Sequence, residues 1–168
     1  MESSGENLVI ILMGVTGSGK STVGEALTQD LGWPFYDGDD FHPPENVAKM
    51  KSGVALEDED RWPWLQRLAG EIGQWLAQGD SAVLACSALK QVYRDVLVGG
   101  RPQVRVVHLK GSKELIGERL AQRQHRYMPA SLLDSQFATL EQPQVAVEVD
   151  IAPEPDAIAG EIRRRLGI

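Results

Sequence analysis

The most constraining feature of this chain is the stretch Gly14–Ser21, which reads Gly-Val-Thr-Gly-Ser-Gly-Lys-Ser. It matches the phosphate-loop pattern G-x-x-x-x-G-K-S/T at every fixed position. An apolar run, Leu8–Met13, precedes it and a helical stretch, Lys20–Leu31, follows it, which is the strand–loop–helix context that the pattern requires. We therefore predict a loop whose backbone N–H groups surround phosphate oxygens at a helix N-terminus.

Two side chains of this loop have predicted roles of their own. The ammonium group of Lys20 is expected to reach the β- and γ-phosphates of ATP, and the hydroxyl group of Ser21 is expected to bind Mg²⁺. The residues that we predict to bind the nucleotide here are Gly14, Val15, Thr16, Gly17, Ser18, Gly19, Lys20, Ser21 and Thr22.

Composition limits the classes of protein to consider. The 168 residues are expected to form one domain, and Cys86, the single cysteine, excludes an intramolecular disulfide. A net charge of -7 disfavours a nucleic-acid partner, because such binding rests largely on phosphate neutralisation by Lys and Arg. The polar, acidic residues 1–7 are unlike a targeting signal, and no apolar run reaches membrane-spanning length. We expect a cytoplasmic protein that binds neither a membrane nor a nucleic acid.

The two signs of charge are separated along the chain. Residues 37–60 hold eight acids and two lysines, whereas residues 90–126 hold nine basic residues and three acids. Phosphoryl transfer from a nucleotide needs carboxylates near the metal and a basic cover, so this asymmetry is typical of such a site. Most of these residues, taken one by one, are equally compatible with a solvated surface.

The apolar patterns predict strands that alternate with helices, and hence an α/β protein with a P-loop kinase fold. We expect a five-stranded parallel sheet with helices on both faces and a helical lid. The single domain, residues 1–168, would contain a substrate-binding insert at about 39–65 and the lid at about 119–137. The expected strands are 8–13, 33–36, 81–86, 104–109 and 145–151; the expected helices are 20–31, 44–50, 112–123 and 131–140, with others that begin near 59 and 88 and around 158–166.

The ends of the strands and the motifs present narrow the function. The central strand ends in Cys86–Ser87 and not in the acid that organises the metal of motor-type ATPases, and the chain contains no Asn-Lys-x-Asp guanine signature. The small size and the basic segment 124–129 favour a small-molecule kinase with a closing lid.

Several longer strings resemble the gluconokinase family over nearly the whole chain. The most specific are Asp58–Leu65 (Asp-Glu-Asp-Arg-Trp-Pro-Trp-Leu) and Ala85–Lys90 (Ala-Cys-Ser-Ala-Leu-Lys). The resemblance implies transfer of the ATP γ-phosphoryl group to the 6-hydroxyl group of D-gluconate, giving 6-phospho-D-gluconate and ADP, by a homodimer. The other residues that carry it are 13–21, 37–43, 49–50, 53, 56, 93–95, 135–137 and 140–141.

Gluconate has a carboxylate at one end and the reacting hydroxyl group at the other. Asp39 is the candidate that orients this hydroxyl group and accepts its proton, and Asp37 could hold Mg²⁺ through water, like the Asp-x-Asp pair of the similar shikimate kinases. Arg61 is the best partner for the carboxylate, because a guanidinium group can bind both oxygens. The alternatives are a solvated turn for the aspartates and a surface ion pair of Arg61 with Asp58 or Glu57.

Further residues complete the predicted substrate site. Lys90 and Arg94, one turn apart on the expected helix, are second candidates for the carboxylate. The sugar hydroxyl groups are assigned to His42, Lys49 and Gln136, although His42 equally suits a turn.

The lid is expected to contribute Arg119 and Arg123, four residues apart, which would face the nucleotide and neutralise charge on the transferred group. The sequence departs here from the family pattern Arg-x-Gly-His-Phe-Met-Pro. Residues 123–129 read Arg-Gln-His-Arg-Tyr-Met-Pro, so that His125 stands one place early and Arg126 takes the usual histidine position. This departure predicts a more basic lid. Outside the lid, Ala55 stands where a proline is common in the family. Cys86 and His108 lie within or at the end of expected strands, and we expect both to have structural roles only.

Two alternative functions remain open. Within the kinases, shikimate or a nucleoside monophosphate could be the acceptor. In another class, the chain could be a nucleotide-binding interaction module that kept the phosphate loop without the chemistry. The joint presence of Asp37, Asp39, Arg61 and a basic lid favours an enzyme.

Overall fold

The computed structural model of the chain describes residues 7–54, 56–122, 130–143 and 146–168. Within these residues, parallel strands form one five-stranded sheet in the order β2-β3-β1-β4-β5. The predicted α/β architecture is confirmed. The strands are β1 (Val9–Met13), β2 (Phe35–Asp37), β3 (Ala82–Ala85), β4 (Val104–Lys110) and β5 (Val147–Asp150).

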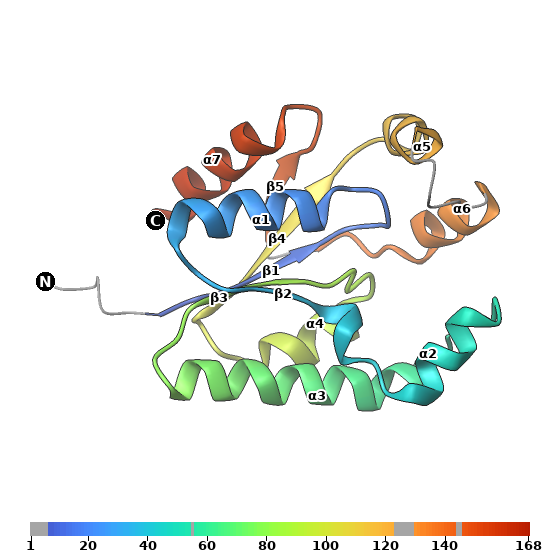
Figure 1. The fold of residues 1–168 in the computed structure, drawn as a ribbon, viewed down its shortest axis with the longest axis horizontal. Coiled ribbons are helices and arrows are strands. Elements are labelled where there is room, and N and C mark those ends of the chain that lie inside the picture. Colours follow the sequence, from blue (N-terminus) through green and yellow to red (C-terminus); the bar gives the residue numbers. More distant parts are fainter. Residues whose placement is uncertain (1–6, 55, 123–129, 144–145) are drawn as a thin grey trace, which may run out of the picture.

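Helices cover both faces of the sheet (Figure 1). On one face lie α1 (Lys20–Leu31) and α7 (Pro155–Leu166), and on the other lie α3 (Asp58–Ala77) and α4 (Gln91–Val98). In the part of the chain that the structure describes, no helix is both long and apolar enough to cross a membrane.

The central strand β1 shows why this sheet needs apolar side chains on both faces. All of its residues are buried. Ile10 and Leu12 belong to the core under α1 and α7, whereas Val9, Ile11 and Met13 belong to the core under α3 and α4. Burial on both faces explains why the strand reads as a continuous apolar run and not as an alternating pattern.

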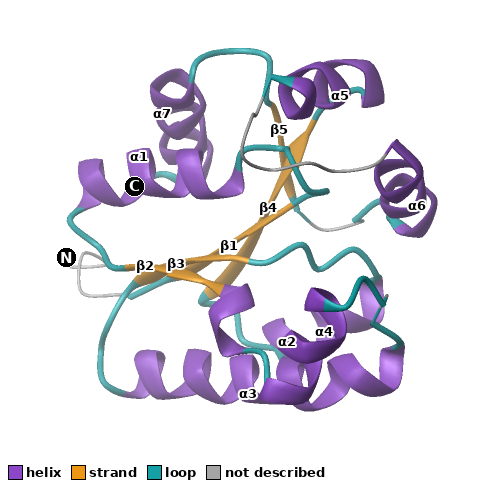
Figure 2. Cartoon of the chain, turned by 45° about the vertical axis from the view of Figure 1, so that its right-hand side comes forward, coloured by secondary structure: helices purple, strands orange, loops and turns teal. Residues whose placement is uncertain are grey.

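The carboxyl ends of the strands point to one end of the molecule, where the remaining elements gather (Figures 1 and 2). In parallel α/β sheets this end carries the binding site. The elements found there are the 3-10 helix η2 (Gly38–Phe41) and the helices α2 (Pro44–Lys51), α5 (Lys113–Ala121) and α6 (Ala130–Thr139).

Several elements begin later than the sequence pattern predicts, and two of these differences have a clear physical reason. The helix expected from Ala88 begins at Gln91, because Ala88 adopts a positive φ of 44° and Lys90 is extended. Lys90 is therefore the N-cap of this helix: its carbonyl oxygen accepts the N–H of Arg94 at 3.2 Å, but its side chain contacts Asp58, whereas that of Arg94 contacts Ala88. Strand β2 begins at Phe35 and extends to Asp37; the prediction began two residues earlier, before Pro34, which has no N–H group for the ladder.

Candidate active site

The phosphate loop joins the end of β1 to the start of α1 (Figure 1). Gly19 precedes the helix with φ 94°, a conformation that favours glycine, and no side chain caps the helix N-terminus. The first N–H groups of α1 are thus available for an anion, and Ser21 and Thr22 in this turn are exposed. Gly17 is required for packing, because a Cβ there would lie 2.9 Å from Cγ of Leu120 in α5.

Two polar groups inside the loop fit a phosphate chain. The hydroxyl group of Ser18 is buried without a hydrogen-bond partner among the described residues. The Nζ of Lys20 donates hydrogen bonds to the carbonyl oxygens of Gly14 (2.9 Å) and Val15 (3.1 Å), which keeps the ammonium group over the loop. An unsatisfied buried hydroxyl group and a cation beside a ring of backbone donors suit the phosphates of a nucleotide.

The ends of three neighbouring strands bring the first aspartate next to this loop. Asp37 in β2 pairs with Ala85 in β3, which in turn pairs with Leu12 in β1. Just beyond the strands, the N–H of Gly14 donates to the carbonyl oxygen of Ser87 at 3.3 Å. The sheet register therefore places Asp37 and the phosphate loop on the same edge, as the sequence predicts.

Cys86 lies at this edge and responds to the charges around it. Burial raises the pKa of the thiol to about 12; the negative charges of Asp39 and Asp37 act in the same direction, and the positive charge of Lys20 opposes them. The thiol is therefore protonated at neutral pH, which confirms the expected core role. The charges of Asp37, Asp39 and Lys20 thus all act on this thiol at the ends of the strands.

The two aspartates differ in contacts and exposure. Oδ1 of Asp37 accepts the N–H of Asp39 at 3.0 Å and caps η2, whereas the side chain of Asp39 is 80% exposed. The described residues contain no group of three or more His, Cys, Asp or Glu side chains that could hold a metal. Mg²⁺ in kinases usually takes one or two carboxylates together with phosphate oxygens and water. Metal binding by Asp37 and Ser21 stays a prediction.

His42 is a buried ring beside Asp39. The imidazole stacks on Trp64 with ring centroids 4.1 Å apart, and its Nδ1 lies 3.1 Å from the amide nitrogen of Asn46, which also donates to the carbonyl oxygen of Asp60 at 2.8 Å. Nδ1 is therefore the acceptor, and the ring proton is on Nε2, which lies 3.8 Å from Oδ1 of Asp39. Burial, and then the charge of Arg61, lower the pKa of His42 to about 4.

These contacts change the role expected for His42. With 3% of its side chain exposed, the residue is mainly a packing partner of α3, and the predicted contact with a substrate hydroxyl group could come only from Nε2. Because the ring is neutral, the charge of Arg61 meets no second positive charge at His42.

We expect acid to destabilise the protein through His42. Because the pKa of this residue falls from 6.5 to about 4 on folding, the unfolded chain binds a proton there between these values and the folded protein does not. Stability is thus retained above pH 6.5 and lost as the pH falls, by about 2 kcal/mol at pH 5. Urea unfolding at pH 7 and pH 5 should show this loss in the wild type and a smaller loss in His42→Gln. An equal loss of unfolding free energy in the wild type and in His42→Gln would show that His42 is not the cause.

A pair of cations shares one carboxylate at the start of α3. Nζ of Lys90 lies 3.3 Å and Nη1 of Arg61 lies 3.8 Å from Oδ1 of Asp58. The hydroxyl group of Tyr93 donates to the same oxygen at 2.5 Å, and this bond and then Lys90 lower the pKa of Asp58. The centre of the Tyr93 ring lies 5.7 Å from Cζ of Arg61 and 5.6 Å from Nζ of Lys90. Asp58 is thus shared by two cations, and the charge of Arg61 also acts on the carboxyl group of Asp60.

Lys49 forms an ion pair with a different carboxylate of α3. Its Nζ lies 2.7 Å from Oδ2 of Asp60, an oxygen that also accepts the N–H of Glu57 at 2.8 Å. The hydrogen bond with Asp60 raises the pKa of Lys49. A contact of Lys49 with a substrate hydroxyl group stays a prediction, and its charge is already balanced.

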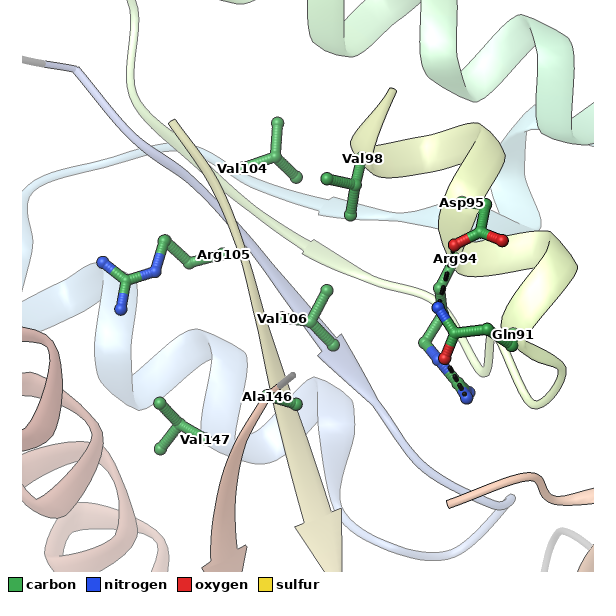
Figure 3. Close-up of a pocket in the computed structure, with 9 residues that line it drawn as sticks. All are labelled: Gln91, Arg94, Asp95, Val98, Val104, Arg105, Val106, Ala146 and Val147. Carbon is green, nitrogen blue, oxygen red and sulfur yellow. Dashed lines mark hydrogen bonds between the residues drawn. The ribbon is translucent and has the colours of Figure 1, made fainter. Parts of the chain in front are cut away.

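The structure corrects the role predicted for Arg94. The residue is 2% exposed, and its guanidinium group donates to the carbonyl oxygens of Ala88 (2.7 Å), Leu89 (3.1 Å) and Glu141 (2.7 Å). Figure 3 shows it beside Gln91 at the start of α4. Arg94 is therefore a structural residue that holds the turn before α4, including the strained Ala88, and is not placed to bind a substrate carboxylate.

Gln136 also has a different partner from the predicted one. Its Oε1 accepts the N–H of Thr16 at 2.6 Å, and its Nε2 donates to Oγ1 of Thr16 at 2.8 Å. Both ends of the amide are thus bound to the phosphate loop and not directed to a sugar hydroxyl group. The partner lies 120 positions away in the chain, so the sequence offered no local signal for it.

Only part of the predicted lid lies within the described residues. Nη2 of Arg119, in α5, donates to the carbonyl oxygen of Ile151 at 2.7 Å, just after β5; its contact with the nucleotide stays a prediction. Arg123, His125 and Arg126 lie outside the described residues, as does Ala55.

Two hollows of the described chain lie away from the acidic end of the site. One, of about 430 Å³, is lined by α4, β4 and β5 (Figure 3). A smaller one, of about 70 Å³, lies between Val15 of the phosphate loop and α6. Neither is lined by Asp39, Arg61 or Lys90.

Sequence reasoning missed three contributors to this site. Tyr93 lies under both cations, and Asn46 and Trp64 fix the ring of His42. Tyr93 and Trp64 stand in strings that carry the family resemblance, which was the available signal.

Known proteins share both the sequence and the fold of this chain. A family model described as shikimate kinase matches residues 16–143. A Xenopus tropicalis protein described as a probable gluconokinase is 42% identical, over 95% of each chain. The crystal structure of a sugar kinase from Janibacter sp. has a TM-score of 0.88 and 42% identity, covering 96% of this chain and 95% of that one. The crystal structure of a gluconokinase from Sinorhizobium meliloti 1021 has a TM-score of 0.81 and 42% identity, covering 96% and 97%.

Proposed function

This chain belongs to the gluconokinase family of ATP-dependent kinases, and from this premise we propose that it phosphorylates D-gluconate on the 6-hydroxyl group. O6 of gluconate forms a bond to the γ-phosphorus of ATP, the bond from this phosphorus to the β–γ bridging oxygen breaks, and ADP leaves. The hydroxyl proton passes to a carboxylate. The products are 6-phospho-D-gluconate and ADP.

The observation that carries the proposal is the surroundings of His42. Its Nε2 lies 3.8 Å from Asp39, and the positive charge of Arg61 lowers its pKa. Asp39 therefore lies beside this ring, and Arg61, in the cation pair, is near enough for its charge to act on the ring. Such an arrangement suits an acceptor that is held by its carboxylate at one end and reacts at the other.

The nucleotide end of the site is supported by the phosphate loop. Backbone N–H groups and Lys20 hold the phosphates, and Arg119 and Arg123 add positive charge from the lid side. Ser21 and, through water, Asp37 would hold Mg²⁺, which would neutralise charge on the phosphates.

Asp39 is the proposed base at the acceptor end. An ordinary aspartate has a pKa near ~3.9 and is a weak base at neutral pH. This is sufficient, because a loose phosphoryl transition state depends more on alignment of the hydroxyl group than on its early deprotonation. The exposure of Asp39 leaves room for an acceptor beside it.

Shikimate is the second candidate acceptor, and the match of residues 16–143 to the shikimate kinase model favours it. Shikimate also has a carboxylate and several hydroxyl groups. An assay of ADP release with Mg²⁺-ATP should compare gluconate, shikimate and AMP. We expect turnover with gluconate and at most background rates with the other two. Turnover with shikimate or AMP in its place would reassign the enzyme, and no turnover with any acceptor would favour a binding module.

We expect Arg61 to set the affinity for the carboxylate. Because a charge-assisted hydrogen bond is worth about 1.5–3 kcal/mol, Arg61→Ala should raise KM for gluconate roughly 10- to 100-fold with a smaller change in kcat. Arg61→Lys keeps the charge but loses the fork, so its KM should lie in between. Arg105→Ala is the control, because Arg105 is an exposed arginine of β4. A KM in Arg61→Ala equal to that of this control would remove Arg61 from the site.

Three further points are proposals about the whole protein. Residues 1–168 form one kinase domain with its insert at about 39–65 and its lid at about 119–137. Family membership supports a homodimer. The composition supports a location in the cytoplasm, with ATP and gluconate as partners and without nucleic acid or membrane.

A further inference from the structure

We propose that residues 136–141, here called the tether, position both substrates: Gln136 fixes the phosphate loop that binds ATP, and Glu141 fixes the turn that carries Lys90. Neither side chain needs to touch a substrate. The second half of this inference rests on the proposed function, because it takes Lys90 as part of the carboxylate site.

The first end of the tether is the double contact of Gln136 with Thr16. The amide accepts the backbone N–H at 2.6 Å and donates to the hydroxyl group at 2.8 Å. Two hydrogen bonds to one residue fix both the position and the rotation of the phosphate loop at this point. Loops without such bonds would have to be ordered each time that ATP binds.

At the second end of the tether, Glu141 makes three hydrogen bonds, through its backbone N–H, one carboxylate oxygen and its carbonyl oxygen. Its N–H donates to the carbonyl oxygen of Leu89 at 2.8 Å, its Oε1 accepts the N–H of Gln91 at 2.8 Å, and its carbonyl oxygen accepts Nη2 of Arg94 at 2.7 Å. Lys90 lies between the first two partners. It is thus held from both sides by a residue 51 positions away in the chain.

Glu141 also supplies a cap that helix α4 lacks. Lys90 occupies the N-cap position, where its own side chain makes no capping hydrogen bond. The carboxylate of Glu141 instead accepts the first N–H of the helix and brings a negative charge to the positive end of its dipole. The extended backbone of Lys90 is therefore stabilised from outside, with its Nζ directed to Asp58.

The segment between the two ends is short and ordered. The N–H of Leu140 donates to the carbonyl oxygen of Gln136 at 2.9 Å, which closes the last turn of this region. Phe137 and Leu140 pack against the core. A single hydrogen-bonded turn thus links the nucleotide loop to the turn of Lys90, and the separation of the two sites is fixed by covalent geometry and not by a flexible connection.

The test uses one variant at each end and measures ATP and gluconate separately. In Gln136→Ala we expect the Kd for ATP, measured by calorimetry without acceptor, to rise about tenfold, with KM for gluconate within twofold of the wild type. In Glu141→Ala we expect the reverse: KM for gluconate rises about tenfold and the Kd for ATP stays within twofold. Glu141→Gln keeps an acceptor for the N–H of Gln91 and should recover most of the loss.

Controls separate positioning from a general loss of structure. Ser135→Ala and Gln142→Ala change exposed neighbours of the two ends and should leave both constants unchanged. Thr16→Val removes the hydroxyl contact from the loop side and keeps the backbone N–H contact. In that background Gln136→Ala breaks one hydrogen bond and not two, so its effect on ATP binding should be smaller. If Gln136→Ala does not fold, Thr16→Val alone still tests the claim, because it removes the hydroxyl contact with Gln136 and should raise the Kd for ATP without changing KM for gluconate.

The inference is overturned if each variant changes both constants by the same factor, or if neither variant changes the constant assigned to it. Its failure can be told from failure of the proposed function. If the wild type does not phosphorylate gluconate, the proposed function is wrong. The role of Gln136 in ATP binding is still tested in that case, because it depends only on the Kd for ATP.

Discussion

Replacing Lys20 with alanine is expected to lower kcat by about 10³-fold, because the variant loses the cation assigned to the phosphates at which charge develops in the transition state. The side chain lies over the loop and donates to the carbonyl oxygens of Gly14 and Val15. A steady-state assay of ADP release with saturating ATP and gluconate measures the effect.

The control for this prediction is Lys51→Ala, which removes an exposed lysine at the end of α2 and should change kcat by less than about twofold. The unfolding midpoint of Lys20→Ala should stay close to that of the wild type, so that lost activity is not lost fold. A Lys20→Ala enzyme with a kcat within tenfold of the wild type would remove this lysine from its assigned role.

Replacing Asp39 with asparagine is expected to lower kcat by about 10²- to 10⁴-fold, the range for loss of a general base. The change keeps the size of the side chain and removes its ability to accept the hydroxyl proton. KM for gluconate should change less than kcat, because the carboxylate end is held elsewhere. Rates with saturating gluconate and ATP give the comparison.

Asp40→Asn is the matched control, since Asp40 is the exposed neighbour of Asp39 in η2 and has no assigned role in the transfer. It should keep near wild-type activity. Equal activity in the two variants, or a large loss in Asp40→Asn alone, would show that the wrong carboxylate has been assigned.

The parts of the fold that could be predicted from the sequence depend on local patterns. The phosphate loop is set by adjacent residues, and the glycine at position 19 is required by its φ of 94°. The buried run of β1 and the alternation of strands and helices follow from apolar periodicity. For the same reason Asp37 could be placed at the carboxyl edge of the sheet before the structure was known.

The parts that could not be predicted depend on contacts between distant residues. Arg94 and Lys90 were expected on one helix face, but the positive φ of Ala88 and the cap from Glu141 move the helix start to Gln91. No helical pattern within residues 88–98 contains that information. Arg94 then becomes buried and Lys90 stays near Asp58.

Side-chain partners were the least predictable part of the site. The pattern that identified Gln136 as polar and near the lid could not show that its amide is bound to Thr16. Similarly, His42 could be assigned to the site but its burial against Trp64 and its pKa of about 4 come from α3. Residue type indicates which chemistry is available, whereas packing decides to which partner each group is directed.

The central claim is that one site holds gluconate by its carboxylate at Arg61 and Lys90 while its 6-hydroxyl group meets Asp39 beside the phosphate loop. A crystal structure with gluconate and a non-hydrolysable ATP analogue tests it most directly. The account predicts the carboxylate on the two cations and O6 within hydrogen-bond distance of Asp39, facing the γ-phosphate. Gluconate bound in the reverse direction, or away from both Asp39 and Arg61, would contradict it.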